Sequence, residues 1–163
     1  MDQRILDDQA FKLLVVAASH DNIPSLIQLG LCYYTGRWTN RNIMMGQQCW
    51  LRAANDGSRE AEVRLAAATV LADSNATRDS LASAVKTLTA ASTDGSTIAQ
   101  LALGYCYENG VGVPKNIPEA VSLYRNCAQR GSRNAFDALK RMYDELRPKD
   151  KEFQVASGSD NGE

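Results

Sequence analysis

The chain has 163 residues, enough for one compact domain or a short array of stacked repeats, and too few for a two-domain enzyme to be expected. Hydrophobic residues make up 44% of it and aromatic residues only 7%, and alanine is abundant, which favours thin, closely packed helices. Eighteen Lys and Arg oppose nineteen Asp and Glu, so the chain lacks the basic footprint of proteins that bind nucleic acids or anionic membranes.

The first predicted element is a helix over residues 4–20, which contains the longest apolar run, Leu13 to Ala18. This run is far shorter than the roughly 20 residues needed to cross a membrane. The preceding residues MDQRILDDQ lack the basic-then-apolar order of a signal peptide. We therefore expect a cytoplasmic protein.

Six further helices follow in three pairs, and each pair belongs to one copy of an internal repeat. The predicted pairs span residues 24–35 and 43–56, residues 60–72 and 79–93, and residues 97–109 and 117–130. The first repeat, Ser25 to Gly57, aligns without gaps on the third repeat, Ala99 to Gly131, at an offset of 74. The middle repeat, Ala61 to Gly95, is a degenerate copy in which Ala66 stands where the other two have Gly30 and Gly104. Self-similarity at a fixed period predicts a stack of repeats rather than a single globular core.

Each predicted pair has recognisable helix ends. The first helix carries L-G-x-x-Y and stops at Gly36 or Gly110, the residue type best suited to a left-handed helix end. We expect the glycine within L-G-x-x-Y to let a neighbouring backbone approach closely. The second helix starts near Ile43 or Ile117, and Pro118 fits a first helical turn.

The ends of the chain are predicted to be half-repeats. The helix over residues 4–20 matches a second helix, and an eighth helix over residues 133–147 matches a first helix. Lys140 stands where that last helix should carry its glycine. We expect both half-repeats to act as polar caps on a solenoid of residues 1–148, followed by a disordered tail of residues 149–163.

The repeat resembles the Sel-1-like repeat, a relative of the tetratricopeptide repeat. The third repeat matches nearly the whole motif, through Leu103, Gly104, Tyr107, Gly110, Gly112, Val113, Asn116, Ala120, Tyr124, Ala128, Gly131 and Ala135. The resemblance implies an all-α fold, a right-handed superhelix or solenoid of about three repeats with half-repeat helices at both ends, about eight helices in all. It also implies a protein that binds other proteins, and we expect a non-enzymatic adaptor that binds a protein or peptide on its concave face. One hypothesis for its use is an immunity-type or regulatory role toward a toxin or effector, because small repeat proteins suit stoichiometric capture.

The candidate binding residues lie on the first helices, which line the inner wall of such a solenoid. Equivalent positions on successive first helices form columns that flank the L-G-x-x-Y face. One column contains Gln28 and Arg64, a second contains Tyr105 and Arg141, and a third contains Tyr34 and Glu108. Tyrosine and arginine often form the energetic centres of interfaces, so these columns predict an anchor set, against the alternative of ordinary solvated helix surface. Trp38, in a loop where the third repeat has Gly112, is either exposed for binding or packed on a neighbouring loop, whereas Trp50 is predicted to be core.

Other chemistry finds little support in the sequence. Cys32, Cys49, Cys106 and Cys127 form no CxxC pair and sit among apolar residues, so we expect buried reduced thiols. With a single histidine, His20, no metal site is expected, and no cofactor either. Ser83 and Lys86 match S-x-x-K, but the mixed scaffold of serine β-lactamases is missing. The rival hypotheses are a small-molecule-binding or hydrolytic pocket on the same scaffold, and self-association, which we do not favour.

Overall fold

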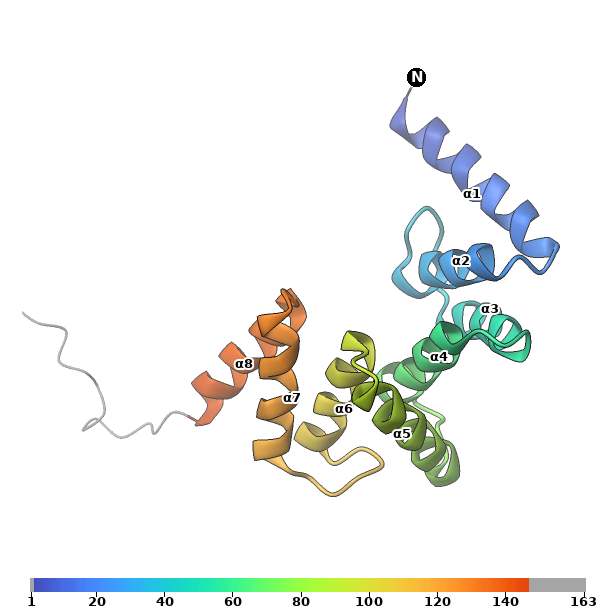
Figure 1. The fold of residues 1–163 in the computed structure, drawn as a ribbon. Helices are drawn as coiled ribbons and strands as arrows, with labels where there is room; N and C mark the ends of the chain where they lie inside the picture. The colour runs from blue at the N-terminus through green and yellow to red at the C-terminus, as the bar shows by residue number, and fades with distance from the viewer. Residues whose placement is uncertain (1, 147–163) are drawn as a thin grey trace, which may run out of the picture.

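The computed structural model describes residues 2–146 and contains only α-helices and their connections within them (Figure 1). The helices are α1 (Gln3–Ser19), α2 (Ile23–Thr35), α3 (Ile43–Asn55), α4 (Arg59–Ala72), α5 (Arg78–Thr93), α6 (Thr97–Asn109), α7 (Ile117–Gln129) and α8 (Arg133–Leu146). Every predicted helix is present, with bounds that differ by at most one residue from those expected. The predicted end of the last helix at residue 147 and the predicted disordered tail lie outside the described residues.

Local capping chemistry explains why the helices begin and end at these residues. Asn42 and Asn116 have matching extended backbones, and each side chain accepts a hydrogen bond from the amide three residues further on. Ser58, Thr77 and Ser96 cap α4, α5 and α6 in the same way. Gly36 and Gly110 end α2 and α6 in the left-handed conformation, at φ 75° and 71°, as the sequence predicted.

The helix pairs stack in chain order into a curved solenoid. Within each repeat the second helix packs on the first, and it also contacts the first helix of the next repeat. Figure 1 shows the stack as an arc with α1 and α8 at its opposite ends. The predicted all-α solenoid is therefore confirmed.

A glycine in each outer repeat makes room for an aromatic ring. A Cβ atom on Gly104 would lie 2.7 Å from Cε1 of Tyr124, and one on Gly30 would overlap the indole of Trp50. We expected a neighbouring backbone close to these two glycines. At Gly30 the backbone of α3 does approach closely, because a Cβ added to Gly46 would lie 2.9 Å from the carbonyl oxygen of Gly30, whereas the nearest atoms at Gly104 belong to the ring of Tyr124.

Three contiguous hydrophobic clusters run along the stack. Leu26 and Leu88 are completely buried in them, and Trp50 is 2% exposed, as predicted for a core residue. All four cysteines are buried and unpaired, as predicted. Burial raises the pKa of the Cys106 thiol to about 11, so this sulfur is an inert packing group near neutral pH.

The two end helices differ from the polar caps that we expected. On α1, Leu13 is 71% exposed and Val16 is 58% exposed. On α8, Phe136 and Tyr143 are 62% and 69% exposed. Lys140 does add polarity to α8, but a single lysine does not cover these neighbouring apolar side chains. None of the described helices combines the length and apolar character needed to cross a membrane.

Candidate protein-binding surface

The first helices form the inner side of the curve in the middle of the stack. The first helices α4 and α6 contact each other directly, whereas no comparable contact joins the second helices α5 and α7. Neighbouring elements lie closer together on the inside of a bend than on the outside. The inner wall is therefore built from the first helices, as repeat proteins of this type arrange their binding surfaces.

Three of the predicted site residues, all on first helices, are at least partly accessible to solvent. Gln28 of α2 is exposed, and Tyr105 of α6 is half-buried. Arg64 of α4 is half-buried and is held by Glu60, whose Oε1 accepts a hydrogen bond of 2.9 Å from its Nε. Because Glu60 and Arg64 are four residues apart on one helix, this pair fixes the guanidinium in place before any partner binds. The binding role of these three residues stays a prediction.

We expected Glu108 to face solvent, but its side chain is buried. It is 7% exposed, and its carboxylate accepts hydrogen bonds from the hydroxyl of Tyr124 at 2.7 Å and from the guanidinium of Arg141. Burial favours a higher pKa for this carboxyl, but the hydrogen bonds from Arg141 and Tyr124 outweigh it and hold the pKa below its ordinary value. Glu108 is thus a buried structural anion that ties α6 to α7 and α8.

Arg141 is the outer member of this network. Its side chain is half exposed and also lies 3.6 Å from Glu145 on the next turn of α8. The hydrogen bond to Glu108 raises the pKa of the guanidinium further, so it stays charged throughout the accessible pH range. A partner that binds Arg141 therefore either shares its guanidinium with Glu108 or displaces Glu108 from it.

Tyr34 also differs from the freely exposed residue that we expected. Its ring lies 5.3 Å from the ring of Trp50 in a tilted arrangement, and the guanidinium of Arg41 lies 5.9 Å from the centre of the Tyr34 ring. Burial raises the pKa of its hydroxyl, with Arg41 opposing the effect. Tyr34 is therefore half-buried and packs on the core of the first repeat.

Trp38 is one of two residues other than glycine with a positive φ among those described. Its φ of 63° matches the 68° of Gly112 at the equivalent loop position, so the loop keeps its backbone shape despite the large side chain. The ring is 37% exposed, and the guanidinium of Arg37 lies 4.5 Å from its centre. This exposed cation and ring pair stays a candidate contact.

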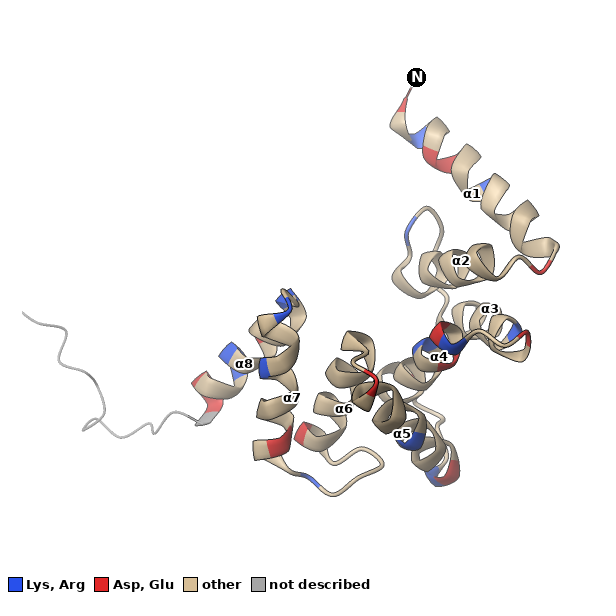
Figure 2. Cartoon of the chain, in the orientation of Figure 1, with Lys and Arg blue, Asp and Glu red and all other residues tan. Residues whose placement is uncertain are grey.

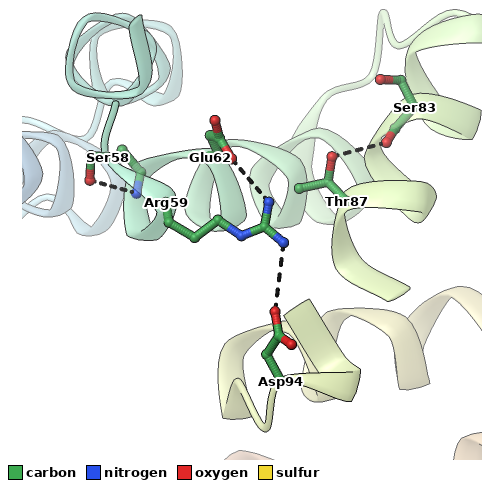
Figure 3. Close-up of polar contacts among 7 residues, drawn as sticks. Ser58, Arg59, Glu62, Ser83, Thr87 and Asp94 are labelled. Carbon is green, nitrogen blue, oxygen red and sulfur yellow. Dashed lines mark hydrogen bonds and ion pairs between the residues drawn. The ribbon is translucent and has the colours of Figure 1, made fainter. Parts of the chain in front are cut away.

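The junction of α4, α5 and α6 carries a different polar cluster. Figure 3 shows Arg59 at the start of α4 reaching Glu62 on its own helix and Asp94 at the end of α5. These contacts measure 3.3 Å and 3.8 Å, and all three side chains are substantially exposed. Figure 2 shows the same mixture of charges elsewhere, with Lys and Arg interspersed among Asp and Glu rather than gathered on one face.

Sequence reasoning missed an apolar cavity between α7 and α8. We call it the α7–α8 groove: an opening of about 500 Å³ lined by Val121, Arg125, Phe136, Leu139, Lys140, Met142 and Tyr143. The sequence signal for it was present in the apolar residues Phe136 and Tyr143, which follow the core spacing of a first helix without a second helix to cover them. A smaller cavity of about 260 Å³ lies between α3, α4 and α5. Residues 2–146 hold no cluster of His, Cys, Asp or Glu side chains arranged for a metal ion.

Comparisons with known proteins agree with this architecture. The Sel1 repeat family matches residues 23–58 and 97–132, which are the first and third repeats. A Sel1 repeat protein from Oxalobacter formigenes is 26% identical with a TM-score of 0.60, over 86% of this chain and 57% of that one. A protective antigen of uropathogenic Escherichia coli, described as displaying an SLR fold, is 22% identical with a TM-score of 0.64, over 86% of this chain and 30% of that one.

A curated relative shares a shorter segment. The mouse protein DAP3-binding cell death enhancer 1 is 37% identical over 60 residues, which are 37% of this chain and 12% of that protein. The rat protein of the same name matches to the same extent. This chain thus corresponds to a small part of each curated relative. Together with the packing described above, the repeat matches and the structural neighbours show that the chain contains two Sel1 repeats within an all-α solenoid.

Proposed function

We propose that this protein is a non-enzymatic adaptor that binds another protein or a peptide on the inner wall of its solenoid. Sel1-like repeats generally mediate protein–protein interaction, and the name of the mouse relative describes a protein that binds another one, DAP3. The observation that carries the proposal is the direct contact between the first helices α4 and α6, which puts first helices on the inner side of the bend. Gln28, Arg64 and Tyr105 belong to three successive first helices, and we propose that they face the partner. A small repeat protein of this kind is suited to binding a cytoplasmic protein in a stoichiometric complex. A toxin or an effector is one such partner.

The side chains on this wall suit recognition of an extended segment or a helix. Arg64 is already held by Glu60, so little conformational freedom is lost when a partner carboxylate contacts it. Tyr105 offers a large ring with few rotatable bonds and a hydroxyl for a hydrogen bond. Residues of these two types account for many of the energetic centres of known interfaces.

Affinity capture from the source cells, followed by titration of the captured protein, tests the proposal. We expect Tyr105→Ala and Arg64→Ala each to weaken binding about tenfold. Met44→Ala is the matched control, because Met44 is 71% exposed but lies on the second helix α3. Equal losses in all three variants, or no loss in any, would show that the partner does not use the inner wall.

A further inference from the structure

The α7–α8 groove is a place in the repeat that no second helix within residues 2–146 covers. Five positions of α8 line it, and four of them stand 74 residues after four positions of α4 that line a cavity: Phe136, Leu139, Lys140 and Tyr143 correspond to Glu62, Leu65, Ala66 and Thr69. In the middle repeat these four positions of α4 face the second helix α5, with which they share a cavity. On α8, no helix within residues 2–146 fills that place, and Phe136 and Tyr143 are mostly exposed.

Helix α1 is the opposite case, a second helix without a first helix before it in the described residues. It repeats the pattern of α5 at the same offset of 74, since Ala10, Leu14 and Ala17 correspond to Ala84, Leu88 and Ala91. The positions of α5 that line the cavity against α4 are Ser80, Ser83, Ala84 and Thr87, and their counterparts on α1 are Leu6, Gln9, Ala10 and Leu13. Leu6 is 42% exposed and Leu13 is 71% exposed. The face of α1 that would cover a preceding first helix is therefore largely exposed, and it is apolar except for Gln9.

We propose that copies of this chain associate head to tail, with α1 of one copy seated as the missing second helix in the α7–α8 groove of the next. In that register Leu6, Ala10 and Leu13 lie against the apolar side chains of the groove. The junction repeats the packing of α5 on α4 within one chain. The solenoid thereby continues from one copy into the next.

The residues at the centre of the junction differ from those of the complete repeats. Lys140 takes the position of Gly104, and Leu14 takes the position of Tyr124. The middle repeat pairs Ala66 with Leu88 here, so the aromatic ring and the glycine are not required, but Lys140 is larger than alanine and its exposed side chain has to extend out of the junction past Leu14. The charges also match, because Arg125 and Lys140 line the groove without a carboxylate, whereas residues 2–12 carry Asp2, Asp7 and Asp8 against Arg4 and Lys12, the last of which is paired with Asp8 at 2.6 Å.

The two surfaces belong to opposite ends of the molecule, as Figure 1 shows, so α1 cannot reach the groove of its own chain. The contact is heterologous, and such contacts produce rings when the rotation closes and open chains when it does not. This association uses neither Gln28 nor Arg64 nor Tyr105. It therefore goes beyond the proposed function and can fail or succeed independently of it.

Sedimentation of the full chain and of two blocked variants tests the proposal. Leu13→Glu blocks the α1 face, and Phe136→Glu blocks the groove; both side chains are mostly exposed, so neither change disturbs the core. We expect the unmodified chain to form larger species as its concentration rises and each variant alone to associate at least about tenfold more weakly. Mixed in equal amounts, the two variants retain one intact α1 and one intact groove and form a 1:1 dimer of twice 17.8 kDa that grows no further.

Control variants separate this result from other causes. Met44→Glu, at a position as exposed as Leu13 but on α3, should associate like the unmodified chain. Tyr143→Glu should repeat the effect of Phe136→Glu if the groove is the docking site. An unmodified chain that stays monomeric at its highest soluble concentration overturns the proposal and leaves the groove to residues 147–163 or to a different protein. Association that persists in both blocked variants, or a mixture that gives no dimer, also overturns it.

Discussion

The first and third repeats place an aromatic ring of the second helix over a glycine of the first helix, but they satisfy the polar edge of that ring differently. In the first repeat, Nε1 of Trp50 donates a hydrogen bond of 3.2 Å to the carbonyl oxygen of Ile27, and Tyr34 packs on the indole. In the third repeat, the hydroxyl of Tyr124 donates to the carboxylate of Glu108. Tyr34 and Glu108 occupy the same position, four residues after the glycine.

This difference separates what the repeat requires from what it tolerates. The glycine and the ring determine how closely the two helices of a pair approach. The residue four positions after the glycine determines whether the ring meets an aromatic neighbour or a charged one. In the third repeat, the carboxylate of Glu108 also forms an ion pair with Arg141, and this contact joins α8 to the preceding helix pair.

The largest loss of stability is expected at the glycine under the aromatic ring, which the first and third repeats share. Gly104→Leu places a side chain where even a Cβ atom would lie 2.7 Å from the ring of Tyr124. Overpacking of this kind should lower the free energy of unfolding by about 3 kcal/mol. Urea unfolding followed by circular dichroism measures the loss. Ser122→Leu, at an exposed position of α7, is the control and should change the stability by less than about 0.5 kcal/mol.

The next effect concerns the position where the two repeats differ. Glu108→Ala leaves the buried hydroxyl of Tyr124 without its partner and should lower the free energy of unfolding by about 2 kcal/mol. Glu108→Gln keeps an acceptor for that hydroxyl and should cost less. The same urea titration compares the two variants. Equal losses would mean that the hydrogen bond to Tyr124 contributes nothing to stability.

A smaller effect is expected at the loop position occupied by Trp38 and Gly112. A Cβ atom on Gly112 would lie 2.9 Å from Cγ2 of Val85, and φ there is 68°, so Gly112→Ala should destabilise the protein by about 1 kcal/mol. The first repeat already holds a side chain at this position, so Trp38→Ala should cost less than Gly112→Ala. Thermal unfolding of both variants checks the order. The reverse order would show that the two loops are not equivalent.

The sequence predicted the fold well because the repeat, the caps and the apolar spacing are all local signals. Gly36, Gly110, Asn42 and Asn116 identify the helix ends by their own chemistry. The burial of Glu108 could not be predicted in this way, because it depends on Arg141, which belongs to a different helix and lies 33 residues away along the chain. The exposure of Phe136 was also missed. Its spacing along the helix is that of a core residue, and it is exposed because no second helix within residues 2–146 packs against it.

The smallest effect is the pH dependence that Glu108 confers. Its pKa in the folded protein is lowered from 4.5, because hydrogen bonds from Arg141 and Tyr124 outweigh the opposing effect of burial. The stabilisation is therefore present above pH 4.5 and is lost as the pH falls below it through the folded value. We expect the difference in stability between the unmodified chain and Glu108→Gln to shrink between neutral pH and pH ~3. A difference that grows on acidification would contradict the direction of this pKa shift.

The most direct test of the shared packing is a pair of double-mutant cycles, one joining Gly30→Ala with Trp50→Leu and the other joining Gly104→Ala with Tyr124→Leu. The middle repeat already combines alanine and leucine at these positions, as Ala66 and Leu88. We predict that each alanine is destabilising beside the ring and nearly neutral beside leucine, with a coupling energy of about 1–2 kcal/mol in both repeats. A coupling energy near zero in either repeat would contradict the account.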